Sequence, residues 1–372
     1  MNYTGLRRSW FKPLVRSLVL ALVLVEALAT AAPASANSSN FNRPGNILIA
    51  DQFNNRAIEI DRHHNIVWQF GVGPKDLAAT SILGVNDAQR VGDLTLMAGT
   101  GIPPKTAQSP FCTDKVIGCP DNRVILVDRK GKIVWQYGTF GVIGSGPNEL
   151  NTPVQDTYLP NGNILITDQA NERIIEVNHE KEIVWQYGTT GMIGPTGTPD
   201  LGDNFLNNPN SAELLANGHI LISDENNNRA IEVNRDKHIL RTFTAGATVS
   251  GVAFASRLKN GNTLLTDSNN SRIVEVNAKD QVVWHFETNT DTGTNAAPLP
   301  TRAVRLRNGH TLISDQFNDR VIEVTHSKRI VFTAGTLNVF GMGGGLLNAP
   351  YDAKVVGDFT GLTPPFGDEG DD

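Results

Sequence analysis

The sequence has no excess of positive charge and very little cysteine. Its 372 residues include 32 Lys and Arg against 38 Asp and Glu, a net charge of −6, and only two Cys. A nucleic-acid-binding protein normally carries a basic face, so this charge balance argues against that class. After residue 36 there is neither an apolar run long enough to cross a bilayer nor a stretch of sustained helical periodicity. Because 40% of the residues are hydrophobic, we expect a folded protein with a large core, built from strands.

The first 36 residues have the pattern of an export signal. Four basic residues between positions 7 and 16 precede the apolar stretch 18–32 and the small-residue site Ala34-Ser35-Ala36, so we expect cleavage after Ala36. Arg7-Arg8 resembles a twin-arginine signal, although Leu6 stands where that pattern prefers a small hydroxyl residue, so the export route stays open. Removing four Lys or Arg and one Glu leaves 28 basic and 37 acidic residues, a net charge of −9. The mature protein is predicted to be secreted or periplasmic.

The export signal decides how the two cysteines are interpreted. Cys112 and Cys119 have six residues between them and lie in a segment rich in Pro and Gly. In an oxidising compartment such a pair most often forms a disulfide, which here would brace a loop. A zinc site would need further ligands, and no His lies nearby.

The strongest signal in the chain is a segment that recurs. Its five intact copies share the pattern D-x-x-N-x-R followed by apolar residues, and they begin at Asp51, Asp168, Asp224, Asp267 and Asp315. A degenerate sixth copy, NRVILVD, covers residues 122–128. The 336 residues after position 36 divide into six units of 56, and a period of that size with only strand signals is typical of β-propeller blades.

Each unit can be divided into four strands. In the third unit they cover residues 154–159, 163–167, 173–177 and 183–187, and Asn-Gly or Asp/Asn turns separate them. The first unit lacks an inner strand, while segment 347–354 resembles residues 150–156 and 206–209, which are taken as the inner strands of the third and fourth units. We therefore predict an all-β, six-bladed propeller of four-stranded blades over residues 37–361, in which the C-terminal strand closes blade one. Residues 362–372 are predicted to be an acidic, disordered tail.

Two family resemblances follow from these motifs. The D-x-x-N-x-R core resembles NHL-type propeller repeats. Asn86-Asp87 and Gln155-Asp156, the latter before Leu159-Pro160-Asn161-Gly162, resemble the His-Asp…Leu-Pro-Asn-Gly-Asn segments of arylsulfotransferase-type propellers. This second resemblance implies a sulfuryl-transfer enzyme with inner-strand histidines, but the matching positions here are Asn86, Gln155 and Tyr351. The lyase relatives of the NHL group bind zinc through histidines, which the inner strands of this chain also lack.

Several recurring residues are expected to be structural. The repeated Asp and Arg would pair across a hairpin in every blade, since chemistry rarely needs five identical copies. Four tryptophans at one place in four units are expected to pack between blades: Trp68, Trp135, Trp185 and Trp284. The eight histidines fall in turns or on outer strands, and His219 and His310 share one position.

The candidate site is the axial channel, where polar residues of the inner strands converge. Its predicted ligand-binding residues are Asn86, Asp87, Gln155, Asp156, Ser211, Glu213, Arg302, Tyr351 and Asp352. Converging carboxylates would suit a cation such as Ca²⁺, or an acid and a base. The alternative is a wet polar channel with no ligand. No other cofactor is indicated.

Long loops form the second candidate surface. They cover residues 99–119, 141–148, 191–204 and 341–345, and propellers usually bind partners through loops on one rigid face. We predict an exported, monomeric scaffold that binds a protein partner or small ligand there or at the channel mouth. The opposing hypothesis is a propeller enzyme that uses channel carboxylates and Arg302. Tight clustering of these charged groups in a closed pocket would favour the enzyme, and scattered groups in an open channel would favour binding.

Overall fold

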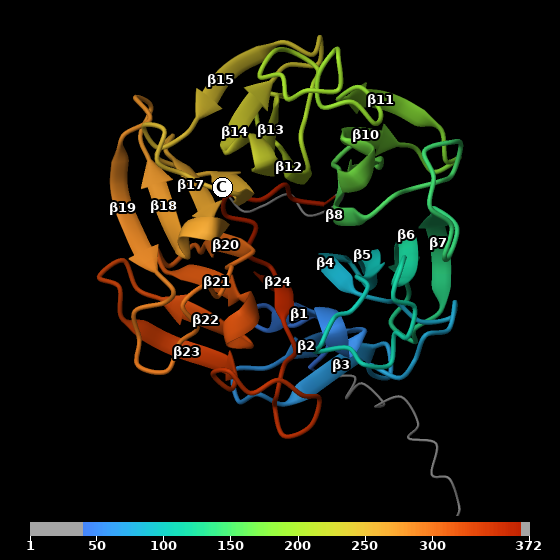
Figure 1. The fold of residues 1–372 in the computed structure, drawn as a ribbon. Coiled ribbons are helices and arrows are strands. Elements are labelled where there is room, and N and C mark those ends of the chain that lie inside the picture. The colour runs from blue at the N-terminus through green and yellow to red at the C-terminus, as the bar shows by residue number, and fades with distance from the viewer. Residues whose placement is uncertain (1–39, 366–372) are drawn as a thin grey trace, which may run out of the picture. The chain divides into compact units, whose positions relative to one another are not determined.

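In the computed structural model, which describes residues 40–365, six antiparallel sheets of four strands are arranged in a ring (Figure 1). From the centre outward, blade 1 contains β24 (Pro350–Val355), β1 (Ile47–Asp51), β2 (Arg56–Ile60) and β3 (Ile66–Phe70), and blade 2 contains β4 (Val85–Val91), β5 (Leu94–Ile102), β6 (Cys119–Val127) and β7 (Ile133–Tyr137). Blade 3 contains β8 (Pro153–Tyr158), β9 (Ile164–Asp168), β10 (Arg173–Val177) and β11 (Ile183–Tyr187).

The other three blades repeat this order. Blade 4 contains β12 (Pro209–Leu214), β13 (Ile220–Asp224), β14 (Arg229–Val233) and β15 (Ile239–Phe243), and blade 5 contains β16 (Val252–Arg257), β17 (Thr263–Asp267), β18 (Arg272–Val276) and β19 (Val282–Glu287). Blade 6 contains β20 (Arg302–Arg305), β21 (Thr311–Asp315), β22 (Arg320–Val324) and β23 (Ile330–Gly335). The six-bladed propeller predicted from the sequence is confirmed.

Blade 1 is closed by β24, as predicted. β24 pairs antiparallel with β1, with Ile49 opposite Ala353 and Leu48 opposite Lys354. The blade is thus assembled from both ends of the described chain, and β1 has no unpaired edge at the centre of the ring.

The repeated Asp and Arg shape one turn in each of five blades. Asp51 ends β1, a 3₁₀ turn follows (η1, Gln52–Asn54), and Asn55 takes the left-handed conformation with φ of 48°. The Arg56 Nε then donates to Asp51 Oδ2 at 2.7 Å, while Asp51 Oδ1 accepts the backbone N–H of Asn348 just before β24. The other 3₁₀ turns are η2 (Gln169–Asn171), η3 (Glu225–Asn227), η4 (Ser268–Asn270) and η5 (Gln316–Asn318). The predicted pairing is confirmed, because the four other intact copies show the same Arg–Asp contact at 2.6–2.7 Å.

Contacts between neighbouring blades also follow the repeat. The indole N–H of each recurring tryptophan donates to a backbone carbonyl of the next blade, for example Trp185 to Arg235 at 3.0 Å. A glutamate on the third strand pairs with an arginine of the next blade, as Glu176 does with Arg235 and Glu275 with Arg305. We call each contact between consecutive blades a seam. The expected inter-blade packing of the tryptophans is confirmed.

The connections between blades lie on one face of the ring, together with the turns between second and third strands, because the strands alternate in direction. We call it the loop-rich face. It also carries the insertion between β5 and β6, where Cys112 and Cys119 form the predicted disulfide. The insertion reaches across blade 1, since the Asn348 side chain donates to the Gln108 carbonyl at 3.0 Å.

Two sequence-based expectations concern export and membrane insertion. The predicted signal, residues 1–36, lies outside the described part of the chain. Within residues 40–365 there is no helix long and apolar enough to span a membrane.

Replacing Arg173 by Ala should lower the free energy of unfolding by about 3–5 kcal/mol, because Asp168 would remain buried without its cation. Arg272→Ala is the matched control: the motif is the same, but the Arg272 side chain is 24% exposed against 3% for Arg173, so water can replace more of its contacts. Urea denaturation measures both. Unchanged stability of Arg173→Ala would contradict the structural role of the repeat.

Candidate functional site

The predicted channel residues fall on successive levels of the six inner strands. One level contains the residues that pair with Ala98, Thr167, Ser223, Thr266, Ser314 and Ala50 of the second strands: Asp87, Gln155, Ser211, Phe254, Arg302 and Asp352. Asn86 and Tyr351 lie one residue nearer the loop-rich face, and Asp156 and Glu213 lie one and two residues farther from it. All nine predicted residues are buried except Tyr351, which is half-buried.

Four charged side chains, joined by ion pairs, meet at the centre of the ring. The Arg302 guanidinium contacts Asp87 Oδ1 through Nη2 at 2.6 Å and Asp352 Oδ1 through Nε at 2.5 Å. The Lys354 ammonium also binds both of these carboxylates, at 2.7 Å from Asp87 Oδ1. Lys354 was missed from the sequence, although it stands two residues after Asp352 and therefore on the same side of β24. We call these four residues together with Asp156 the central charge cluster.

Burial and mutual charge set the protonation of this cluster. Burial raises the pKa of Asp352, and Arg302 and Lys354 oppose that rise. Burial alone would lower the pKa of Arg302, but Asp352 and Asp87 raise it above its ordinary value. Arg302 therefore stays charged between the two carboxylates that it contacts.

Asp156 differs from the residue at the same position of every other blade. The equivalent residue is alanine in the other five blades: Ala88, Ala212, Ala255, Ala303 and Ala353. The Asp156 side chain is buried, and neither carboxyl oxygen meets a hydrogen-bond donor among the described residues. Burial, and then the nearby Asp87 carboxylate, raise the pKa of Asp156 well above its ordinary value. Asp156 therefore holds its proton to a higher pH than an ordinary aspartate does.

The C-terminal segment closes one mouth of the channel. The Thr363 backbone N–H and hydroxyl donate to Glu213 Oε2 at 2.8 and 2.6 Å, and Gln155 donates to Glu213 Oε1 at 3.0 Å. Figure 1 shows this red segment crossing the central opening. Thr363 is 1% exposed, so the first residues of the tail that we expected to be disordered, 362–365, pack into the ring instead. Residues 366–372 lie outside the described chain.

Amide and hydroxyl groups surround the mouth on the loop-rich face. The Tyr351 hydroxyl of blade 1 donates to Asn210 Oδ1 of blade 4 at 3.0 Å, so it crosses the ring. Gln316 donates to Gln52 and Gln52 to Asn86, both at 2.8 Å. Sequence reasoning missed these glutamines. A signal existed, because the residue after the repeated Asp is polar in every intact copy: Gln52, Gln169, Glu225, Ser268 and Gln316.

The cation-site hypothesis finds no support in this geometry. Within residues 40–365, no three or more His, Cys, Asp or Glu side chains are arranged to hold a metal ion. Asp87 and Asp352 are already bound to Arg302 and Lys354. His219 and His310 lie at the ends of inner turns, where they contact Glu232 and Glu323.

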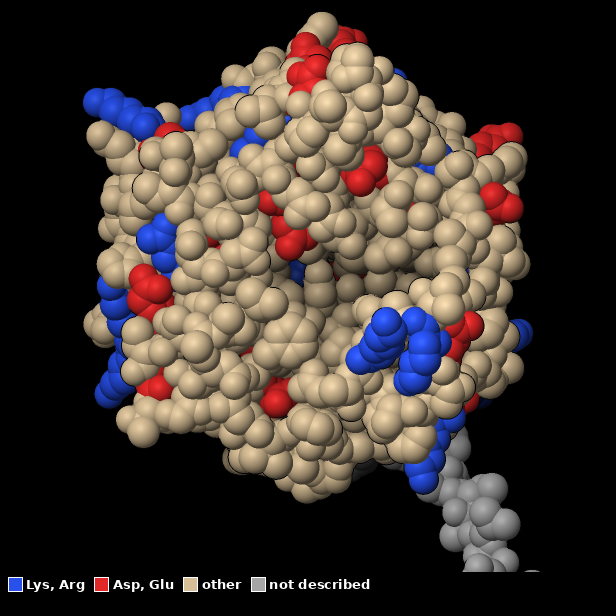
Figure 2. Space-filling view, viewed as in Figure 1, with Lys and Arg blue, Asp and Glu red and all other residues tan. Residues whose placement is uncertain are grey.

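The charged groups are thus clustered and closed off, as the enzyme hypothesis requires, but most of them bind one another. Viewed from one side, the ring is hollowed at its centre (Figure 2). Tyr351 spans the mouth on the loop-rich face, and Thr363 lies below the cluster. Asp156 is 1% exposed, so a substrate could reach it only after neighbouring groups moved.

Comparison with known proteins supports the fold and goes no further. No family model and no curated protein matches the sequence. A solved structure of a Bacteroides caccae protein of unknown function has a TM-score of 0.54 at 16% identity, covering 82% of this chain and 98% of that one. A streptogramin B lyase structure has a TM-score of 0.52 at 13% identity, covering 82% and 88%. The NHL and arylsulfotransferase resemblances therefore stay predictions.

Replacing Asp156 by Ala, the residue of the other five blades, should make the protein more stable at neutral pH. In the unfolded chain this acid ionises near pH 4, whereas in the folded protein it keeps its proton to a higher pH. Folded wild-type protein therefore loses stability as the pH rises from about 4 towards the raised pKa, and the variant does not.

The measurement is the melting temperature of both proteins between pH 4 and pH 8. We expect the melting temperature of the variant to rise by several degrees relative to that of the wild type as the pH increases across this range. Asp156→Asn, which keeps the size of the side chain, should behave in the same way. Parallel pH profiles for all three proteins would show that Asp156 is not held uncharged.

Proposed function

We propose that this protein is an exported scaffold that binds a protein partner through its loop-rich face. The supporting observation is the position of its exposed apolar side chains. Ten of them lie on the connections between blades or in the insertion: Val72, Phe111, Val116, Ile117, Val142, Ile143, Leu201, Val339, Phe340 and Met342. Apolar side chains gathered on one face of a soluble domain are typical of a contact surface.

The insertion is the most exposed part of this surface. Val116 is 84% exposed and Ile117 55%. The Asp114 carboxylate accepts the backbone N–H groups of both residues, at 2.8 and 3.0 Å, and these bonds lower the pKa of Asp114. The disulfide closes the same segment. Side chains held in place before contact lose less conformational entropy on binding, which favours affinity.

A groove beside the insertion could accept a side chain of the partner. Its volume is about 200 Å³, and it lies between the insertion and the connection that enters blade 3. Ile102, Pro103, Ile117 and Ile143 give it apolar walls. These walls suit an apolar anchor residue of the partner.

The enzyme hypothesis has one specific observation in its favour, the central charge cluster. A buried Asp156 whose pKa is raised well above its ordinary value, beside the Asp87 carboxylate, resembles the pair of a general acid and a base. The scaffold remains the better proposal, because the loop-rich face is accessible while Asp87, Asp156 and Asp352 are all buried.

The test replaces Val116 and Ile117 together by Asp in the mature protein. The immobilised wild type captures its partner from the extracytoplasmic fraction, mass spectrometry identifies that partner, and the affinities of both forms are then measured. Losing the burial of two aliphatic side chains, worth about 1.5–3 kcal/mol each, should weaken binding at least tenfold.

The matched control replaces Val184 and Val283 by Asp. These side chains are 51% and 52% exposed but lie on the outer strands β11 and β19, away from the loop-rich face. We expect this control to bind as the wild type does. Equal binding by the Val116/Ile117 variant, or equal losses in both variants, would contradict a binding role of the insertion.

A further inference from the structure

Five of the six outer strands carry an aromatic residue at the same position, at or next to the last residue of the strand. These residues are Phe70, Tyr137, Tyr187, Phe243 and Phe286, each opposite the residue that follows the recurring Arg of the neighbouring strand. In blade 6 the equivalent residue is Ala334, opposite Val321. Blade 6 therefore lacks one aromatic ring that every other blade has.

Each of the five rings fills the seam to the next blade. Tyr187 of blade 3, for example, packs with Ile222 and Ile231 of blade 4 in one buried cluster. The cluster at the seam between blades 6 and 1 contains the corresponding Ile49 and Ile58, but faces them with Ala334. An alanine in place of a ring leaves space unless neighbouring groups move in.

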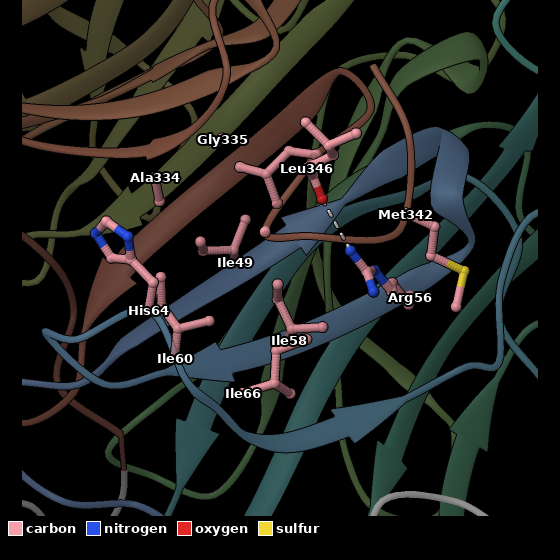
Figure 3. A pocket seen from close by; sticks show the side chains of 12 residues that line it. Ile49, Arg56, Ile58, Ile60, His64, Ile66, Ala334, Gly335, Met342 and Leu346 are labelled. Carbon is pink, nitrogen blue, oxygen red and sulfur yellow. Dashed lines mark hydrogen bonds between the residues drawn. The ribbon is translucent and has the colours of Figure 1, made fainter. Parts of the chain in front are cut away.

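A pocket lies at this place (Figure 3). Ile49, Ile58, Ile60 and Ile66 of blade 1 form one wall, and Ala334 lies opposite. His64 and Arg56 stand at its two ends in Figure 3, and the Arg56 guanidinium is already bound to Asp51 and to the Leu346 carbonyl. The interior is thus apolar and offers no free charge to a ligand.

A glycine-rich segment, residues 341–346, covers the pocket. Its residues Met342, Gly345 and Leu346 line the cavity, which has a volume of about 30 Å³ with the segment in this position. A cavity that binds benzene measures about 150 Å³, so this segment has to shift to admit a ring. A shift is feasible, since Gly343, Gly344 and Gly345 have open space around their Cα atoms and Met342 is partly exposed.

Among the described residues, the same seam also lacks the side-chain hydrogen bond that the outer strand makes to the next blade in the other five seams. Phe332 stands where four blades have the tryptophan that donates to the next blade, and a phenyl ring cannot donate. In blade 4, Arg241 makes this contact instead, to the Ala278 carbonyl. Across the seam between blades 6 and 1, Arg62 pairs with Glu323 and lies over the Phe332 ring.

We propose that the pocket between blades 6 and 1 is a binding site for one uncharged aromatic ring of a small molecule. The ring takes the place of the one that is missing at Ala334, and residues 341–346 move outward to admit it. Ile49, Ile58 and Leu347 then contact the ligand as Ile222, Ile231 and Leu206 contact Tyr187. This site is separate from the partner-binding surface proposed for the insertion.

The experiment measures the binding of benzene to the mature protein by titration calorimetry and by the shift in melting temperature. We expect saturable binding to the wild type with a raised melting temperature. In Ala334→Phe the restored ring occupies the site, so benzene binding should weaken at least tenfold. Ala334→Leu, a smaller change, should weaken it as well and provides the same test if the Phe variant does not fold. Benzoate should not bind, because its charge has no partner in the pocket.

Two further variants serve as controls. Phe243→Ala creates the same vacancy at the seam between blades 4 and 5, and should add a second benzene site. Val116→Asp with Ile117→Asp should leave benzene binding unchanged, so failure here is distinguishable from failure of the proposed partner surface. No saturable binding to the wild type, or equal binding to wild type, Ala334→Phe and Ala334→Leu, would overturn the proposal.

Discussion

A buried ion pair between an aspartate and an arginine underlies every intact blade. Each Asp ends the second strand, and its carboxylate binds the Arg that begins the third strand. In four of these blades the same carboxylate also accepts a backbone N–H from the segment that enters the inner strand. One side chain therefore fixes the turn and the start of the innermost strand together. Several hydrogen bonds offset the cost of burying the charges, which an isolated pair would not achieve.

The ring is symmetric in its turns and asymmetric at its centre and seams. Asp156 replaces an alanine, and Ala334 replaces an aromatic residue. Each exception departs from a repeat that five other blades obey. Packing alone favours uniform blades, because the same residues solve the same contact each time. The two exceptions therefore stand where function is most reasonably sought.

Much of the fold followed from the sequence, since the repeat marks turns and strands locally. The closing strand was predicted because residues 347–354 resemble two other segments that enter inner strands. The central contacts were harder to predict. Lys354 meets Asp87 across 267 residues of sequence, and Thr363 meets Glu213 across 150. No local pattern encodes such pairs. Ala334 was overlooked for a different reason: a missing side chain is visible only when all six outer strands are aligned in register.

The closure of blade 1 has a consequence for how the molecule assembles. Asp51 receives its backbone partner from Asn348, 297 residues later in the chain. Until β24 arrives, the inner edge of β1 exposes unpaired N–H and C=O groups, although five other blades can already have formed. During that interval β24 of another copy fits the edge as well as the chain's own strand does. Domain swapping through blade 1 therefore competes with correct closure, and dilute conditions favour the single ring.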